Sequence, residues 1–186
     1  MAIDPDIQIL GGGSNGGCYL LAIRLNGGQN LRFGMFNQGQ EMCLNAGNYL
    51  YVGSARAGQG ASSLGYRLLR HATRSADAPP HAIRERLHHA IKDAGLPGKV
   101  PAKKTCRWHI DYLLDLPHAE IAGVIAARSV SADEKRLAGL LAALPETVIP
   151  ARGLGASDHP GGTHLLLVRA GKEWWANLPK LLSELI

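Results

Sequence analysis

Gly47-Asn48-Tyr49-Leu50-Tyr51-Val52-Gly53 is a short aromatic stretch, and a related signal, Gly17-Cys18-Tyr19, stands upstream of it. Tyrosine and β-branched residues favour strands, so both stretches predict strands of a sheet. The upstream strand extends over residues 21–25, where large apolar side chains occupy alternate positions. The fold is therefore organised around two strands that each carry a tyrosine close to a glycine.

A basic helix follows the second tyrosine strand. Ser62-Ser63 is a suitable N-cap, and we expect the helix over about residues 64–75. Its basic side chains are spaced so that they share one face, opposite the apolar face. They are Arg67, Arg70, His71 and Arg74. Such a stripe is repulsive unless an anion neutralises it, which favours phosphate binding over a merely solvated surface.

The rest of the pattern predicts one α/β (α+β) domain, residues 16–186, with a small mixed central sheet flanked by helices. Residues 1–15 are rich in glycine near their end and are expected to form a flexible lead-in. Apolar alternation predicts further strands over residues 31–36, 108–114, 121–127 and 163–169. Apolar residues at helical spacing predict helices that begin near Pro79, Ser131 and Trp174.

Composition limits the class of protein. A chain of 186 residues can bury a core without metal or disulfide staples. Its apolar runs are too short to span a bilayer, and its start lacks the layout of a signal peptide. Three widely spaced cysteines argue against a disulfide framework, so we expect a cytoplasmic protein with no membrane contact.

Positive charge is concentrated in one segment. Eleven lysines and arginines lie between Arg56 and Arg107 against three acids, so this segment carries +8 and the rest of the chain −3. Such clustering suits a polyanion, because neutralised phosphates release condensed counterions. A nucleic acid is therefore an expected partner, and a solvated basic surface is the alternative.

The order of these motifs resembles the GIY-YIG endonuclease superfamily, and most closely its Uri-type branch. The resemblance spans residues 16–169 and rests on Gly17-Cys18-Tyr19, Tyr51-Val52-Gly53, Arg67 with His71, Glu134, and residues 47–55, 108–113 and 155–165. It implies a GIY-YIG-like fold and a metal-dependent endonuclease that hydrolyses phosphodiester bonds of DNA. The strand over residues 31–36 matches an insertion that the Uri-type branch also has.

The resemblance implies roles around the scissile phosphate. Tyr19 and Tyr51 would flank it, with Tyr19 orienting or deprotonating the attacking water. Free tyrosine has a pKa near 10, so a basic role requires a nearby cation or metal to lower it. Arg67 would stabilise the developing charge, and His71 would share the anion or protonate the leaving oxygen. The alternative is that the two tyrosines only pack within the sheet.

Glu134 is the candidate metal ligand. By the resemblance it would hold one Mg²⁺ (or Mn²⁺), since hard cations prefer carboxylate oxygen. The competing interpretation is structural, because Ser131-Ala132-Asp133-Glu134 has the spacing of a capping box, in which the glutamate returns to the N-cap amide. One carboxylate serves only one of these roles well.

The remaining candidates surround this centre. Five basic residues are expected to hold the nucleic-acid backbone: Arg56, Arg70, Arg74, Lys103 and Lys104. His109 and Asp111 would alternate onto one strand face and form an accessory imidazole–carboxylate pair, or else be ordinary surface residues of the strand. A zinc site is a weaker alternative, because Cys106 with His109 and His159 with His164 have ligand spacings.

Two classes of function stay open at this point. One is the endonuclease, and the other is a nucleic-acid-binding or structural adaptor that keeps the scaffold without turnover. The endonuclease hypothesis requires Tyr19, Tyr51, Arg67 and Glu134 to converge on one pocket. It also requires the phenol of Tyr19 to reach that pocket rather than lie buried.

Overall fold

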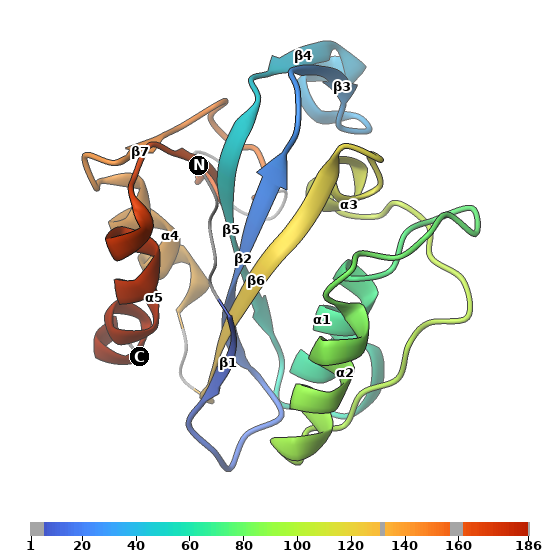
Figure 1. Ribbon diagram of the computed structural model, residues 1–186, viewed down its shortest axis with the longest axis vertical. Coiled ribbons are helices and arrows are strands. Elements are labelled where there is room, and N and C mark those ends of the chain that lie inside the picture. The colour runs from blue at the N-terminus through green and yellow to red at the C-terminus, as the bar shows by residue number, and fades with distance from the viewer. Residues whose placement is uncertain (1–5, 131–132, 157–161, 186) are drawn as a thin grey trace.

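A mixed six-stranded sheet divides the protein into two layers of helices (Figure 1). The computed structural model describes residues 6–130, 133–156 and 162–185. The strands lie in the order β1-β6-β2-β5-β8-β7, and only β1 and β6 run parallel. Their bounds are β1 Ile7–Leu10, β2 Gly17–Leu25, β5 Gly47–Ala55, β6 Ala119–Arg128, β7 Thr147–Val148 and β8 Leu165–Val168. The predicted α+β class with a mixed central sheet is confirmed.

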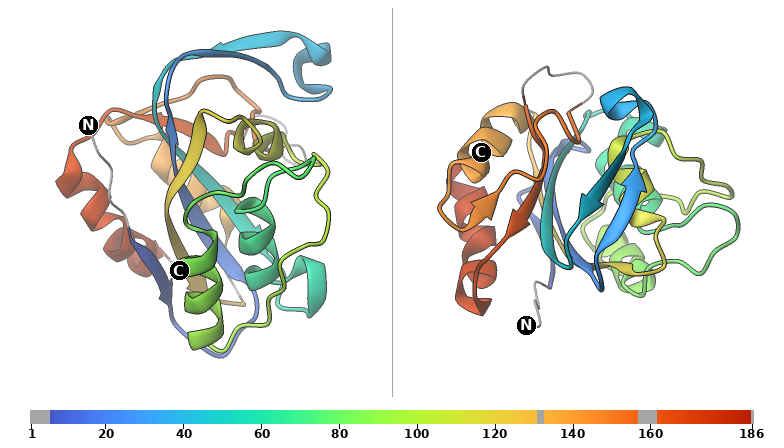
Figure 2. Two further views of the ribbon diagram at one scale, coloured as in Figure 1. Left: turned by 45° about the vertical axis from the view of Figure 1, so that its right-hand side comes forward. Right: turned by 90° about the horizontal axis from the view of Figure 1, so that it is seen from above.

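Each face of the sheet has its own helices and its own core. Helices α1 (Leu64–His71), α2 (Arg84–Asp93) and α3 (His109–Leu114) cover one face, and α4 (Glu134–Ala142) and α5 (Lys172–Leu185) cover the other (Figure 2). Alternation along β2 divides the core, because Tyr19 and Leu21 point to the α1 side and Cys18 and Leu20 to the α5 side. No helix in the described part of the chain is long and apolar enough to cross a membrane.

The strand predicted over residues 108–114 is wrong, because this segment forms helix α3. The side chains of Ile110, Leu113 and Leu114 are buried, which is the spacing of a helix face rather than of a strand. The carboxylate of Asp111 starts the helix by accepting the backbone N–H groups of Arg107 and Trp108, each at 2.9 Å. Tertiary contacts therefore override the alternating pattern in this short element.

Two further expectations are corrected near the N-terminal half. Ile7–Leu10, expected to belong to a flexible lead-in, forms strand β1 and pairs with β6 from Ile7 opposite Val124 onward. The strand predicted over residues 31–36 ends at Arg32 as β3 (Gln29–Arg32). It pairs with a second short strand, β4 (Glu41–Leu44), and η1 (Phe36–Gly39) lies between them. This hairpin projects from one end of the main sheet (Figure 1).

The short length of β8 leaves one end of β5 uncovered. β8 pairs with β5 only from Asn48 to Tyr51, and the carbonyl of His164 then accepts the N–H of Val52. Beyond this point β5 still pairs with β2 through Ala55, and no strand among the described residues pairs with its other edge. Side chains from both layers of helices can therefore meet at this end of β5.

Candidate functional site

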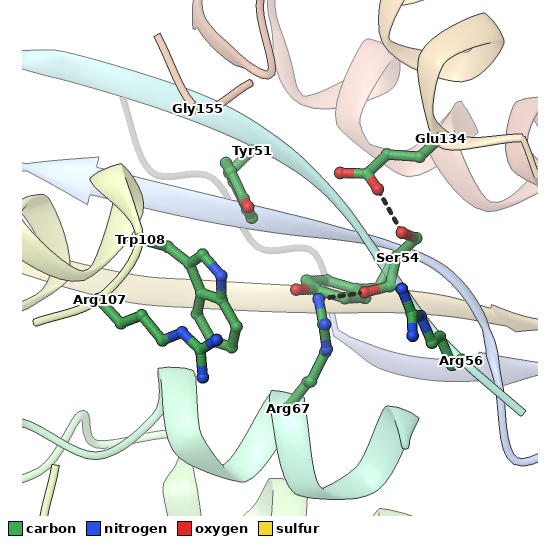
Figure 3. A pocket seen from close by; sticks show the side chains of 9 residues that line it. Tyr51, Ser54, Arg56, Arg67, Arg107, Trp108, Glu134 and Gly155 are labelled. Carbon is green, nitrogen blue, oxygen red and sulfur yellow. Dashed lines mark hydrogen bonds between the residues drawn. The ribbon is translucent and has the colours of Figure 1, made fainter. Parts of the chain in front are cut away.

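A pocket of about 370 Å³ lies at the open end of β5. Figure 3 shows Arg67 reaching it from α1 on one side of the strand and Glu134 from α4 on the other. We call it the tyrosine pocket, and its lining residues are Tyr19, Tyr51, Ser54, Arg56, Arg67, Arg107, Trp108, Glu134 and Gly155. Three arginines and one glutamate give this lining a net positive charge, which suits an anion.

Tyr19 forms part of the floor of the pocket and is held by a histidine behind it. Its hydroxyl lies 2.8 Å from Nε2 of His71, and its ring centroid lies 6.4 Å from that of Tyr51. Only 1% of Tyr19 and 6% of Tyr51 is exposed to solvent. The four side chains converge as predicted. The requirement that the phenol of Tyr19 not lie buried is not met, which counts against the endonuclease and favours the adaptor, although Tyr19 still lines the pocket. Any chemistry of Tyr19 must take place at the pocket floor.

The glycine of the second motif makes room for this phenol. Tyr19 and Gly53 are paired directly across β2 and β5. A Cβ at Gly53 would lie 2.3 Å from Cζ of Tyr19 and 2.5 Å from its hydroxyl, which no real side chain tolerates. The tyrosine and glycine signals of the two strands therefore meet at one contact.

Burial sets the protonation states on the floor. Burial raises the pKa of Tyr19 above its usual 10, and the nearby Arg67 guanidinium only partly opposes this. Burial also lowers the pKa of His71 to about 3, although Asp111 acts in the opposite direction. At neutral pH the phenol is protonated and the imidazole is neutral. Arg67 alone does not supply the lower pKa that a basic role of Tyr19 requires, because the cost of desolvation is larger, and a bound metal is the other expected source.

His71 lies between Tyr19 and a buried carboxylate. Its Nδ1 is 3.9 Å from Oδ1 of Asp111 and has no hydrogen-bond partner among the described residues. Burial alone would raise the pKa of Asp111, but His71, Arg70 and two backbone N–H groups together lower it. A permanent negative charge therefore faces the far side of the imidazole. This charge opposes the effect of burial only in part, because Lys104, Arg70 and Arg67 act with burial to lower the pKa of His71.

Arg67 is fixed at the pocket by a strand carbonyl and an indole. Its Nη1 donates to the carbonyl oxygen of Ser54 at 2.8 Å, and its guanidinium lies 4.9 Å from the ring centroid of Trp108. Its Nε has no partner within the described chain. Arg107 also lies over Trp108, at 5.7 Å, and is exposed. Arg70 lies over the same ring at 4.6 Å, so Trp108 makes cation–π contacts with three guanidinium groups, of which Arg67 and Arg107 line the pocket.

Glu134 begins α4 and turns its carboxylate toward the open end of β5. The hydroxyl of Ser54 donates to Oε2, and Nδ1 of His164 lies 2.9 Å from Oε1. The N-cap of α4 is Asp133, whose carboxylate accepts the N–H groups of Lys135 and Arg136. The capping role expected for Glu134 is therefore wrong, since its carboxylate points at other partners. Ser131 of the expected capping box lies outside the described residues.

The donor set around Glu134 suits a hard divalent cation. A carboxylate beside the Ser54 hydroxyl offers oxygen ligands, and Mg²⁺ in nucleotide-processing sites commonly uses one or two carboxylates plus substrate phosphate. No group of three or more His, Cys, Asp or Glu side chains gathers as a metal cage among the described residues. The surroundings of Glu134 therefore fit a metal that is completed by substrate oxygens rather than a cage.

Three of the expected backbone-binding residues instead have internal partners. Arg70 donates twice to Asp111, at 2.8 and 3.0 Å. Arg74 is 8% exposed and contacts Glu120 at 2.8 Å, and Lys104 is 6% exposed and contacts Asp115 at 3.0 Å. Burial against these carboxylates keeps Arg74 and Lys104 from a nucleic-acid backbone, whereas the role of Arg70, whose side chain is 19% exposed, stays a prediction.

Arg56 and Lys103 remain exposed, although they lie at different places. Arg56 lines the tyrosine pocket, whereas Lys103 borders a separate hollow near Pro79 and Pro80. The helix stripe predicted from Arg67 to Arg74 is thus not one exposed face, since His71 is fully buried and does not line the tyrosine pocket.

His109 and Asp111 do not form the accessory pair expected from a strand. Because the segment is helical, Asp111 turns into the core toward Arg70 and His71. Nδ1 of His109 instead accepts the N–H of Gly155 at 3.2 Å. The zinc alternative gains no support from Cys106, whose thiol donates to Asp115, and His159 lies outside the described residues.

Sequence reasoning missed several residues of the pocket, among them Ser54, Arg107, Trp108 and, behind Glu134, His164. Ser54 directly follows the tyrosine–glycine motif, Arg107 ends the basic segment and Trp108 follows it, so the sequence places all three next to recognised motifs. Their roles were not visible, because the strand assignment of residues 108–114 separated Trp108 from Arg67. The contact between Glu134 and the Ser54 hydroxyl joins two residues that lie 80 positions apart in the sequence.

The comparisons with known proteins point to one family. Residues 18–186 match the family described as "Domain of unknown function DUF123". Neither the curated proteins nor the solved structures include a match to the chain. The matched span includes every residue of the tyrosine pocket. The chain therefore belongs to the DUF123 family.

Proposed function

We propose that the protein is a metal-dependent endonuclease that hydrolyses phosphodiester bonds of DNA. The observation that carries this proposal is the meeting of Tyr19, Tyr51, Arg67 and Glu134, which are distant in sequence, in one positively charged pocket. The resemblance to GIY-YIG endonucleases assigns the same four residues to one centre. The three cysteines are free, which agrees with the reducing cytoplasm that we propose as its compartment.

Binding of the phosphate follows from the arginines. Arg56 and Arg107 are exposed at the pocket, and Arg67 is held with its guanidinium against Trp108. Guanidinium groups bind phosphate through charge-assisted hydrogen bonds and keep their charge at any physiological pH. Because Arg67 is already fixed by Ser54 and Trp108, it can stabilise charge that develops on the phosphoryl oxygens without reorganising.

Activation of water follows from the hydrogen bond between Tyr19 and His71. The phenol oxygen accepts a proton from the attacking water while the phenol proton passes to Nε2 of the neutral imidazole. The water oxygen forms a bond to phosphorus, the bond to the leaving oxygen breaks, and that oxygen takes a proton from solvent. The Asp111 carboxylate, 3.9 Å from Nδ1, offsets the cost of the buried positive imidazole only in part, so His71 holds this proton transiently and then releases it to solvent.

Glu134 would hold the metal, with the Ser54 hydroxyl beside it. When bound, Mg²⁺ or Mn²⁺ supplies Lewis-acid polarisation of the phosphoryl group. The Ser54 hydroxyl, which donates to Oε2, keeps the Glu134 carboxylate directed toward β5. Tyr51, whose pKa burial raises well above 10, stays protonated and offers a neutral hydrogen-bond donor beside Tyr19.

A second candidate is a nucleic-acid-binding adaptor without turnover. It is favoured by the 1% exposure of Tyr19 and by the partners that Glu134 already has in Ser54 and His164. The two candidates share the arginines and differ in whether a phosphodiester bond breaks.

Incubation of the purified protein with branched, nicked and single-stranded DNA separates these candidates. The reactions contain Mg²⁺, Mn²⁺ or a chelator, and products are resolved on denaturing gels. The endonuclease predicts products that require metal and disappear in the chelator. Salt-sensitive binding without products in any metal would contradict the proposal and leave the adaptor.

A further inference from the structure

A second hollow, of about 630 Å³, lies next to the tyrosine pocket where the β3–β4 hairpin meets α3. We call it the hairpin pocket. Its walls include the rings of Phe33, Phe36, His109 and Tyr112, with Met35 and Arg107 at the opening. Met35 is 84% exposed, an unusual environment for a large apolar side chain.

The hairpin pocket adjoins the tyrosine pocket at two points. Arg107 lines both pockets. In addition, the N–H of Gly155, which lines the tyrosine pocket, donates to Nδ1 of His109, which lines the hairpin pocket. A ligand group held by Arg107 in the first pocket therefore has its neighbouring group at the opening of the second.

The rings of the hairpin pocket are held in place by packing. Phe36 and His109 meet edge to face with centroids 5.1 Å apart. Gly34 has a φ of +59°, and a Cβ there would lie 2.8 Å from the hydroxyl of Tyr112. Fixed aromatic surfaces lose little conformational freedom when a flat ligand stacks on them.

The chemistry of the walls selects a flat, uncharged ring attached to an anion. None of the described residues that line the hairpin pocket is acidic, and Arg107 supplies positive charge at its opening. Aromatic side chains beside a basic groove are the usual means of holding the bases of single-stranded nucleic acid. A base that remains paired in a duplex stays stacked on its neighbours and cannot enter.

We infer that the hairpin pocket binds one unpaired nucleobase next to the phosphate in the tyrosine pocket. The substrate class is then DNA that is single-stranded or locally unpaired at the cleaved position. This inference rests on the proposed function for the identity of the polymer. It does not depend on whether the phosphodiester bond is cleaved.

The test measures binding without turnover. Single-stranded oligonucleotides that carry one abasic position, moved along the strand, are titrated with the full chain in chelator and followed by fluorescence anisotropy. We expect one abasic position to weaken binding about tenfold, within the range for loss of one base–aromatic stack. A scan without a weak position, or no binding of single strands at all, would overturn the inference.

Variants then assign the effect to the hairpin pocket. Phe36→Ala should weaken binding of the intact strand about tenfold and remove the difference between intact and abasic strands. Met35→Ala changes a side chain that is 84% exposed, so it should fold normally and act in the same direction. Leu140→Ala is the matched control, because Leu140 is also an exposed apolar residue and lies on α4. Discrimination retained in both hairpin variants would overturn the inference.

The same measurements separate this inference from the endonuclease proposal. If no metal yields products but the abasic scan shows one weak position, the endonuclease proposal fails and the base site stands. If the protein cleaves DNA but the scan is flat, the endonuclease stands and the base site fails.

Discussion

The phenol of Tyr19 on β2 lies against the Cα of Gly53 on β5, directly across the strand pair. This contact lets the Tyr19 hydroxyl pass over the neighbouring strand and reach Nε2 of His71 at 2.8 Å. The glycine after the second tyrosine is therefore required by the first tyrosine, rather than by the turn that follows it.

Gly53→Ala should disrupt this contact. The added Cβ would lie 2.3 Å from Cζ of Tyr19, so the ring must move and the bond to His71 is lost. We expect a loss of about 2 kcal/mol in the free energy of unfolding, typical of overpacking in a core. We also expect cleavage to fall at least about 100-fold, the contribution of a positioned proton-transfer group.

Gly139→Ala is the matched control for that substitution. A Cβ at Gly139 meets nothing within 4 Å, and the residue lies inside α4. It should therefore stabilise the protein by up to about 1 kcal/mol through helix propensity and leave cleavage unchanged. Urea unfolding and cleavage rates check both variants, and equal behaviour of the two would contradict the role given to Gly53.

Two arginines of the basic segment should respond differently to substitution. Arg74 is buried against Glu120, so Arg74→Ala should cost about 3 kcal/mol of stability and leave the salt dependence of DNA binding unchanged. Arg56 is exposed at the tyrosine pocket, so Arg56→Ala should keep stability and lower the salt slope by about one phosphate contact. Unfolding curves and binding at several salt concentrations measure both, and a reversed pattern would show that the two roles are exchanged.

The metal should depend on Glu134 and on the hydroxyl beside it. Glu134→Gln removes the charge that holds the cation, so cleavage should require higher Mg²⁺ and fall at saturation. Ser54→Ala removes the hydrogen bond to Glu134 but keeps the carboxylate, so it should raise the Mg²⁺ requirement by a smaller factor, on the order of tenfold. Cleavage rates measured over a series of Mg²⁺ concentrations test whether Glu134→Gln raises the Mg²⁺ requirement more than Ser54→Ala does. An unchanged Mg²⁺ requirement in Glu134→Gln would place the metal elsewhere.

Acid should destabilise the protein partly through His71. Its pKa is lowered from 6.5 to about 3, so between these values the unfolded chain binds a proton that the folded chain does not. The contribution of His71 to the free energy of unfolding is fully present above pH 6.5. It falls as the pH drops toward 3, by up to about 1 kcal/mol for each pH unit. His71→Gln should show a shallower slope between pH 6.5 and 4.5 in urea unfolding. Parallel slopes for wild type and variant would contradict the burial of a neutral His71.

Much of the architecture was predictable because it depends on local signals. Alternating apolar residues predict β2 and β6, and helical spacing predicts α1 and α2, although α1 ends at His71 rather than near residue 75 and α2 begins at Arg84 rather than near Pro79. Helix α3 resembles a strand in the sequence because large apolar side chains alternate at Trp108, Ile110 and Tyr112, and six residues carry too little helical signal. The decisive interaction is the Asp111 carboxylate at the start of α3, and its partner Arg70 lies 41 residues away.

The same limit applies to the candidate site. The convergence of Tyr19, Tyr51, Arg67 and Glu134 was predicted from motif order, and the structure brings them together. The fate of Arg74 and Lys104 was not predictable, since basic spacing on a helix or loop does not reveal which buried carboxylate each cation will meet. Burial likewise decides the pKa of Tyr19, and burial is a property of the whole fold.

The single-turnover cleavage rate of Tyr19→Phe tests the central claim most directly. The substitution removes one hydroxyl and keeps the buried ring, so folding and DNA affinity should match the wild type, while the rate in saturating Mg²⁺ falls at least about 100-fold. Arg67→Ala, which removes the guanidinium fixed by Ser54 and Trp108, should abolish cleavage as well. A Tyr19→Phe protein that cleaves at the wild-type rate would contradict the account, because the hydroxyl at the pocket floor would then take no part in the reaction.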